Sequence, residues 1–417
     1  MITWANLRAS AAPWMVLPAL LFSGLYITAN RITVPTAYGV EAGEAVAQAL
    51  PIVVGAVAAV AAWEAGRHRL LGAFPTTAAR SALRQFAWAV APVVALQAVL
   101  LVGSFLLAAN TVGTLPSGAG GWLGVAHALV LPLGWTAIGW RLGHILPRSL
   151  AAPIAGIGGW MFLSFPQGMA NPWLRHLGGF IDGFSSPTDT RSPLAYLVPW
   201  VVLCGLVLAL WLPSLVRQRV SAISLGLALV IAAILLGRAA VADWGYFRPS
   251  DARVVTPVCA GETPRVCLPP EYASYMDGVR KDLAEPLAKL RDTGVPMPSE
   301  LLLASSKEPL KPGVWPLIWS LPLANGQTNP DSFRADLAES AVTGTTVNAG
   351  VTPCRRPGSM PAAWAALVVG VNEENVRRAM PPPAWQEITK IRTLPKEKQV
   401  AWFTEAARAQ KHCGVGS

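Results

Sequence analysis

Lysine is missing from the first two thirds of this 417-residue chain, since the first lysine is Lys281. A P-loop needs the lysine of GxxxxGK[ST] to reach the phosphates of a nucleotide, so no P-loop can lie before that residue. The motifs HExxH and GxSxG, which mark common zinc proteases and serine hydrolases, are also missing. We therefore expect no catalytic residues, no intrinsic enzyme activity and no cofactor bound by this chain.

Charged residues are scarce, at 13% against 53% hydrophobic residues. An ordinary soluble domain has about 25% charged residues. This composition predicts a membrane protein, and the lysines from Lys281 onward predict that a water-soluble domain follows. The formal net charge of +10 lies largely in arginine-bearing loops between apolar runs. Lipid headgroups can balance that charge, so we expect a lipid bilayer as a partner and no nucleic acid.

Seven apolar runs approach the roughly 20 residues that cross the hydrocarbon core of a bilayer. A signal peptide is the alternative for the first run, but no clear small-residue cleavage site follows it. The sequence predicts a polytopic helical membrane domain at residues 1–242, with spans at residues 11–28, 46–63, 86–109, 122–140, 150–165, 194–212 and 221–241. His127 is the exceptional ionisable residue within the spans, and a hydrogen bond between helices is a better interpretation of it than a proton relay.

The arginines of the loops favour one orientation. With a cytosolic N-terminus, the outside loops contain chiefly Arg31, Arg175 and Arg191, whereas the inside segments contain Arg8, the cluster from Arg67 to Arg84, Arg141, Arg148, Arg217 and Arg219. Arginine marks the cytoplasmic side because it resists translocation. We expect a multi-pass protein of the plasma membrane whose N-terminus is cytosolic. An odd number of spans then places residues 243–417 outside the cytoplasm.

Five cysteines divide between the two parts of the chain. Cys204 falls in the sixth span, where we expect a buried apolar thiol. The other four lie in the part predicted to be extracytoplasmic, where disulfides persist. Three connectivities are possible, and we favour Cys259 with Cys267 and Cys354 with Cys413. A zinc site is the weaker alternative, because there are no paired CxxC motifs and His412 is the only histidine there, so we expect no metal.

Residues 243–417 are long enough for one small hydrophobic core. Strand-like segments occur at residues 253–258 and 266–268, and helical patterns at residues 270–291, 330–342, 372–379 and 395–410. The predicted fold class is therefore mainly α: a helical membrane domain followed by a small α+β domain.

Residues 63–88, WEAGRHRLLGAFPTTAARSALRQFAW, form a cationic interruption between two apolar runs. Their position after the second span, and the long outside loop between the fifth and sixth spans, resemble the permease subunit of an ABC-2 type transporter. The amino-acid sequence of the segment is similar to that of the coupling helix of actinobacterial members, which docks into the ATPase subunit. The resemblance implies that the docking residues here are Glu64, Arg67, Arg69, Thr76, Thr77, Arg80 and Arg84. The alternative is that the arginines only anchor the loop at anionic lipid.

Residues 166–193 resemble the outer re-entrant hairpin of the same family. The resemblance assigns its apolar face to Trp173, Leu177, Phe180, Ile181 and Phe184. Six spans then follow the ABC-2 pattern, and the seventh span and the C-terminal domain depart from it.

The function implied is that of a membrane-spanning permease subunit of an ABC-2 type exporter that moves a hydrophobic or amphipathic compound, such as a peptide, a lipid or a drug. A separate ABC ATPase subunit would bind ATP and Mg²⁺, and a second permease subunit would complete a homodimer or a heterodimer. The alternative is a non-transporting membrane protein whose extracytoplasmic domain binds a ligand or acts as a sensor.

Overall fold

The computed structural model describes residues 4–29, 35–70, 82–169, 173–181, 183, 185–216, 218–246, 248–305, 307, 309–317, 330–348 and 359–409. The chain divides into two compact units. Unit 1 consists of residues 1–31, 37–186 and 190–251, and unit 2 consists of residues 32–36, 187–189 and 252–417. Each unit has its own core and is described by itself.

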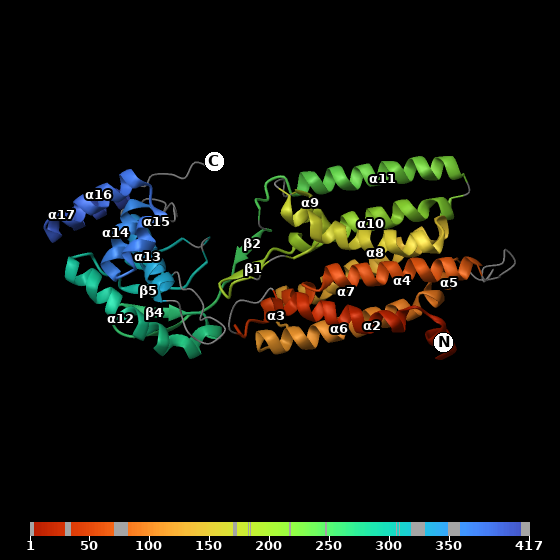
Figure 1. Cartoon of the computed structure of the whole chain (residues 1–417), viewed down its shortest axis with the longest axis horizontal. Coiled ribbons are helices and arrows are strands. Elements are labelled where there is room, and N and C mark those ends of the chain that lie inside the picture. The colour runs from red at the N-terminus through yellow and green to blue at the C-terminus, as the bar shows by residue number, and fades with distance from the viewer. Residues whose placement is uncertain are drawn as a thin grey trace. The chain divides into compact units, whose positions relative to one another are not determined.

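Unit 1 is a helical bundle whose long helices run side by side (Figure 1). Its helices are α1 (Trp4–Ala9), α2 (Ala12–Ala29), α3 (Gly39–Ala47), α4 (Leu50–Leu70), α5 (Ala82–Ala89), α6 (Ala91–Val112), α7 (Gly118–Ile145), α8 (Arg148–Ser164), the 3-10 turn η1 (Phe165–Gly168), α9 (Trp173–Gly178), α10 (Leu194–Leu215) and α11 (Arg219–Ala240).

Within the described residues, seven helical stretches are long and apolar enough to cross a membrane: Ala12–Ala29, Gly39–Leu70, Ala91–Val112, Gly118–Ile145, Arg148–Gly168, Leu194–Ser214 and Val220–Ala240. The prediction of a multi-pass helical protein is thus confirmed at that level. The second stretch has 32 residues and begins at Gly39, before the predicted start at residue 46, because α3 continues into α4 with one turn between them. It is also the most buried of the seven.

Small residues bring the central helices close together. α4 packs against α7 and α8, and α3 packs against α7. A side chain added at Gly139 or Gly143 of α7 would collide with the backbone of Ala58 or Ala62 on α4. Close approach of this kind drives helix association in lipid, where apolar side chains gain little by leaving the bilayer.

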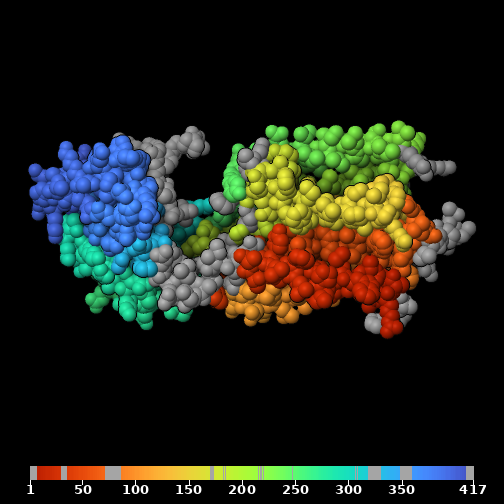
Figure 2. Space-filling view, in the orientation of Figure 1, coloured from red at the N-terminus to blue at the C-terminus, as the bar shows by residue number. Residues whose placement is uncertain are grey.

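Outer faces of the bundle carry large apolar side chains. Trp14, Leu17 and Leu21 on α2 are each more than half exposed, as are Leu235 and Leu236 on α11. α11 is the least buried of the seven stretches, and it covers one side of the bundle in Figure 2. Exposed apolar bands around helices of spanning length are the surface expected to face lipid.

The two ends of the bundle differ in what they hold. α1, α5 and the C-terminal end of α4 lie at one end, here called the α5 end, whereas α3 and α9 lie at the other, here called the α9 end (Figure 1). A two-stranded sheet pairs β1 (Asp189–Arg191) with β2 (Ser250–Ala252).

Unit 2 combines a small sheet with helices. The strands β3 (Val258–Ala260), β4 (Arg265–Leu268), β5 (Glu300–Leu302) and β6 (Val314–Pro316) lie in that order, with β3 antiparallel to β4 and the others parallel. The helices are η2 (Pro270–Tyr275), α12 (Met276–Thr293), α13 (Pro330–Asn348), α14 (Met360–Val369), α15 (Glu373–Ala379), α16 (Pro382–Arg392) and α17 (Lys396–Arg408). β4, α12 and β5 form a parallel crossover unit.

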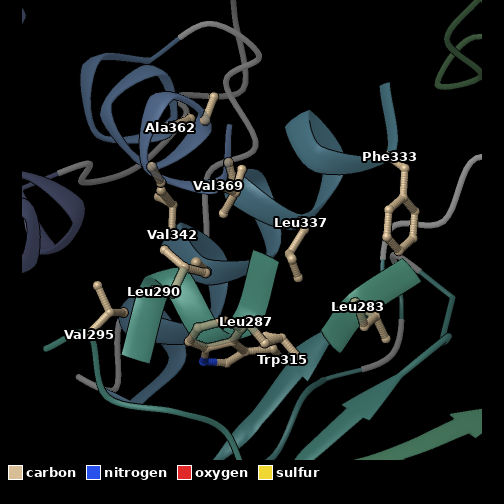
Figure 3. Close-up of a cluster of buried hydrophobic side chains, with 14 of the residues drawn as sticks. Leu283, Leu287, Leu290, Val295, Trp315, Phe333, Leu337, Val342, Ala362 and Val369 are labelled. Carbon is tan, nitrogen blue, oxygen red and sulfur yellow. The ribbon is translucent and has the colours of Figure 1, made fainter. Parts of the chain in front are cut away.

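One hydrophobic core holds unit 2 together. Leu283, Leu287 and Leu290 follow one face of α12 and pack with Trp315 of β6 and with side chains of α13 and α14 (Figure 3). Trp364 and Phe403 lie in the same core, with ring centroids 5.0 Å apart. The prediction that a small sheet-containing domain follows the spans is confirmed.

We expect that replacing Gly143 by Leu will separate α7 from α4, because the new side chain has no space beside Ala62. Overpacking of this kind typically costs about 1–3 kcal/mol. The loss of stability should appear as a lower unfolding temperature of detergent-purified protein, measured by size-exclusion chromatography after heating. Gly158 on α8 is the matched control, because an added Cβ there meets no atom within 4 Å. An equal effect of Gly143→Leu and Gly158→Leu would contradict this account of the packing.

Candidate functional site

A buried ion pair connects α3 to the segment between α9 and α10. Glu44 of α3 is 0% exposed, and its Oε1 accepts hydrogen bonds from Nε of Arg191 and from Oγ of Ser185, each at 2.8 Å. Its Oε2 accepts a hydrogen bond of 2.6 Å from the backbone N–H of Ser185. We call Glu44, Ser185 and Arg191 the Glu44 cluster.

The charges of the Glu44 cluster are compatible with burial only as a pair. Arg191 is 8% exposed, so its guanidinium has little access to solvent. Burial lowers the pKa of Arg191, but the carboxylate of Glu44 outweighs burial and raises the pKa above its ordinary value. Removal of either partner would leave a buried charge without compensation, which costs far more than the pair itself contributes.

Side chains from two spanning stretches hold the backbone that precedes this cluster. Nε2 of Gln48 donates to the carbonyl of Ile181, and Nε2 of His127 on α7 contacts the carbonyl of Gly179. The indole N–H of Trp200 can only donate, and it lies 2.8 Å from Nδ1 of His127. Nδ1 is therefore the acceptor, and Nε2 carries the hydrogen that it donates to Gly179. His127 thus joins α7, α10 and the 179–181 backbone, as expected of a structural hydrogen bond.

A second buried cation holds the ends of α9 and α10. The guanidinium of Arg248 donates to the carbonyls of Ala195, Arg175 and His176, with the closest at 2.6 Å. Burial and, after it, the charge of Arg191 lower the pKa of Arg248 to about 9. That pKa is still above neutral pH, so Arg248 remains charged and can donate to all three carbonyls.

His176 closes the same region. Its Nε2 lies 2.9 Å from the carbonyl of Gly245, and burial lowers its pKa below the ordinary value. Arg175 lies over the ring of Tyr246 with 3.9 Å between the guanidinium carbon and the ring centroid. Together these contacts fasten irregular backbone to the α9 end of the bundle, which is the condition under which such backbone is tolerated near a bilayer.

At the α5 end, another buried carboxylate joins three helix ends. Glu64 of α4 is 0% exposed and accepts hydrogen bonds from Oγ of Ser10 and from the backbone N–H of Ala11, which precedes α2. Arg67 donates to its other oxygen at 2.8 Å. Two residues after Arg67, Arg69 donates to the carbonyl of His144 near the end of α7. The C-terminal end of α4 is therefore tied to the start of α2 and the end of α7.

The structure describes the side chains of three of the seven predicted docking residues, Glu64, Arg67 and Arg69. Glu64 and Arg67 pair with each other, and Arg69 is exposed. Arg84 lies in α5, but its side chain, like Thr76, Thr77 and Arg80, falls outside the residues that the structure describes. Docking of an ATPase at this end stays a prediction, and Glu64 has in addition a role within the chain.

The predicted outer hairpin is compact where it is described. Trp173 and Leu177 lie on α9, which has six residues, and Phe184 is outside the described residues. Leu177, Phe180 and Ile181 are buried in the cores of unit 1, with exposed fractions of 5% or less. These apolar side chains therefore pack within this chain.

The cysteine predictions can be followed in part. Cys259 of β3 and Cys267 of β4 form the predicted disulfide between directly paired positions of two antiparallel strands. Their sulfur atoms lie near a carboxylate oxygen of Glu300 but are bonded to each other, so they are not metal ligands. Cys354 and Cys413 lie outside the described residues. Cys204 is a free, exposed thiol on α10, so the expectation of a buried one is wrong for this chain taken alone.

Sequence reasoning missed the Glu44 cluster. The predicted second span begins at residue 46 and leaves Glu41 and Glu44 outside it, yet both are buried. The available signal in the sequence was this pair of acidic residues, three positions apart in an otherwise apolar segment. Arg191 and Arg248 carried no such signal, because only the fold brings them to the α9 end.

Comparison with known proteins adds one finding. Residues 266–413 match the model of a family described as Domain of unknown function (DUF7224). The match lies within unit 2 and covers less than half of the chain. No curated protein and no solved structure matches the chain.

Glu44→Gln should destabilise the protein, because it leaves the guanidinium of Arg191 buried without its counter-charge. Breaking a buried pair costs about 3–5 kcal/mol, so we expect a clear fall in the unfolding temperature of detergent-purified protein. Glu44→Gln combined with Arg191→Met should lose less than the sum of the two single changes. Asp243→Asn, a change at an exposed acidic residue of the same unit, is the control. Additive losses would argue against coupling between Glu44 and Arg191.

Proposed function

We propose that this chain is the membrane-spanning permease subunit of an ABC-2 type exporter. A separate ABC ATPase subunit supplies ATP hydrolysis with Mg²⁺, and a second permease subunit, identical or different, completes the transport path. The cargo is a hydrophobic or amphipathic compound such as a peptide, a lipid or a drug. The protein lies in the plasma membrane with its N-terminus in the cytosol.

The observation that carries the proposal is the place of α4 in the bundle. The basic segment that resembles a coupling helix, residues 63–88, begins within the last turns of α4, which belongs to the most buried spanning stretch of unit 1. α4 packs against α2, α6, α7 and α8. A force applied at the end of α4 therefore reaches most of the bundle, as a permease without its own nucleotide site requires.

The same helical stretch extends from one end of the bundle to the other. Its 32 residues would span about 48 Å as an α-helix. Glu64 lies near its C-terminal end and Glu44 near its N-terminal end, and each carboxylate binds elements outside the stretch. In this proposal, a movement of α4 caused by the ATPase changes the strain on the Glu44 cluster and loosens the segment at residues 179–191.

The distribution of exposed arginines supports the orientation. Arg8, Arg69 and Arg148 are exposed at the α5 end, whereas Arg175, Arg191 and Arg248 of the α9 end are buried. Arg238 in the last turn of α11 is exposed at the α9 end, where its guanidinium lies over the ring of Trp173. Among the described residues, exposed arginines are therefore in excess at the α5 end, which agrees with a cytosolic α5 end. α11 starts from that end and finishes at Ala240, so unit 2 would follow on the extracytoplasmic side, where its disulfide would persist.

A non-transporting receptor or sensor is the second candidate, because unit 2 has a hydrophobic core of its own. Buried charges within the spanning stretches favour transport over a simple anchor. Ionisable groups at such depth are costly and generally mark functional machinery.

Reversal of Arg80 and Arg84 to Glu should abolish co-purification with an ABC ATPase subunit, because the introduced carboxylates would repel the acidic groups of the docking cleft. Arg67 and Arg69 are left unchanged so that the pair with Glu64 and the hydrogen bond to His144 survive. The control is the reversal of Arg280 and Arg291, exposed arginines of unit 2. Binding and ATP turnover that survive the first double change would rule out docking at this loop, and the lack of any ABC ATPase encoded beside this protein would count against transport altogether.

Epitope tags placed after Leu70 and after Ser417 should report opposite sides of the membrane. We expect antibody to reach the C-terminal tag in intact spheroplasts and the tag after Leu70 only after permeabilisation. This result follows from an odd number of spans and a cytosolic α5 end. Access to both tags in intact cells, or to the Leu70 tag alone, would overturn the orientation.

A further inference from the structure

His176 of α9 is a buried imidazole that lies outside the spanning stretches of unit 1. It is 0% exposed, and its Nε2 lies 2.9 Å from the carbonyl of Gly245. A carbonyl can only accept a hydrogen bond, so Nε2 carries the hydrogen. The ring also packs edge-on against Trp244, with 5.2 Å between the ring centroids. His176 thus links α9 to the segment at residues 241–246, which follows α11.

The second ring nitrogen of His176 determines which protonation state the site accepts. Nδ1 is buried and has no hydrogen-bond partner among the described residues. In the neutral ring Nδ1 is an uncharged acceptor. In the imidazolium it would be a charged N–H donor without an acceptor, and burying a charged group without a partner costs far more than burying a neutral one. The site therefore fits the neutral ring and disfavours the protonated one.

Two buried arginines lie next to His176. Nη2 of Arg248 is 3.4 Å from the backbone carbonyl of His176, and Arg175 directly precedes His176 on α9. Burial is the largest cause that lowers the pKa of His176. The hydrogen bond to Gly245 opposes burial, and the charges of Arg248 and Arg175 lower the pKa further. The net shift is downward, so His176 is neutral at neutral pH.

The elements around α9 supply no carboxylate that favours a charged His176. α9 packs against α8, η1, α10 and α11. α8 and η1 bring no ionisable side chain to this end, since Arg148 of α8 lies at the α5 end. No carboxylate contributes to the pKa of His176, and Asp243 is exposed. The remaining ionisable groups of the described neighbouring elements are Tyr196 of α10, Arg238 of α11, and Tyr246 and Arg248 after α11.

We propose that His176 is an acid switch, whose protonation separates α9 from the segment at residues 241–246 and opens the α9 end of unit 1. In the closed state the neutral ring donates to Gly245. Once the ring reaches solvent it can take up a proton, and the imidazolium cannot return beside Arg175 and Arg248 without burying a third positive charge. Acid therefore shifts the equilibrium toward the open state. In the proposed orientation the switch responds to the pH outside the cytoplasm, but the opening itself depends neither on that orientation nor on transport.

The direction of the pH effect follows from the pKa of His176 in the two states. That pKa is below the ordinary value of 6.5 in the closed state and returns to the ordinary value in the open state, where solvent reaches the ring. The closed state therefore has its full stability well above pH 6.5 and loses stability as the pH falls below 6.5. Between pH 7.5 and pH 5.5, one histidine can raise the opening equilibrium at most about tenfold.

Hydrogen–deuterium exchange of the full-length chain in phosphatidylcholine nanodiscs tests the switch. Exchange is measured by mass spectrometry at pH 7.5 and pH 5.5 and corrected for the intrinsic pH dependence of amide exchange. Peptides that cover residues 173–178 and 241–246 should exchange about three- to tenfold faster at pH 5.5 after this correction. Peptides from α12, which contains no histidine, should not change. Exchange at Cε1 of the histidine rings gives the pKa of His176 in the unaltered protein, which should lie below 6.5.

Two variants distinguish His176 from the other titrating groups. His176→Gln retains a side-chain N–H that can reach Gly245 but does not titrate, so acid should no longer speed exchange in the two peptides. His144→Gln, near the end of α7 at the α5 end, is the matched control and should keep the response of the unaltered protein. Thermal unfolding of each variant verifies that the protein is folded.

Three results would overturn the proposal. One is equal corrected exchange of the two peptides at both pH values, and another is an acid response that survives in His176→Gln. The third is a pKa of His176 at or above its ordinary value. An increase of equal size in α12 would show that acid unfolds the whole chain, which also contradicts a local switch. If His176→Gln does not fold, the pKa and the exchange of the unaltered protein decide the question.

Discussion

Backbone groups that leave a helix near the hydrocarbon core must find hydrogen-bond partners within the protein, and the α9 end of unit 1 is built around that requirement. The described residues between α9 and β1 form no regular secondary structure, and Gly179 and Gly183 have positive φ. Glu44, Gln48 and His127 reach this backbone from spanning stretches and supply the partners. The cost is a buried carboxylate, which is why Arg191 has to lie beside Glu44.

Close approach of the helices makes this arrangement possible. Gly43 of α3 faces Gly121 and Gly124 of α7, where no side chain fits between the backbones. α3 is thereby fixed against α7, and Glu44 follows Gly43 directly in the chain. The same pattern recurs further along α7, where Gly139 and Gly143 lie against the backbone of Ala58 and Ala62 of α4. Small residues thus set the positions of the helices, and the buried polar groups then determine which loop fits over their ends.

Much of unit 1 could be predicted from the sequence, because a membrane-spanning helix is a continuous run of about 20 mostly apolar residues. The seven runs were visible as apolar segments, and the disulfide of Cys259 and Cys267 was favoured by their short separation. The Glu44 cluster could not be predicted in this way, since Glu44 and Arg191 are 147 residues apart and each looks like an ordinary loop residue. The surroundings of His176 were equally invisible, because the groups that contact it lie 69 and 72 residues later in the chain. Local pattern finds elements, whereas a site made of distant residues requires the fold.

The buried cation sites at Arg191 and Arg248 give a physical reason why arginine, and not lysine, occurs there. Arg248 donates to three carbonyls through two nitrogens, and Arg191 uses one nitrogen for Glu44 and another for the carbonyl of Gly183. A planar guanidinium presents five donors in fixed directions, whereas the ammonium group of lysine is a compact point charge that is more strongly hydrated. Lysine at either position would lose hydrogen bonds and cost more to bury. A bundle that holds irregular backbone at its end with buried cations therefore favours arginine. The exposed arginines at the α5 end have the same planar guanidinium, whose paired N–H groups can bind a carboxylate in a bidentate way, as docking of the proposed ATPase subunit would require.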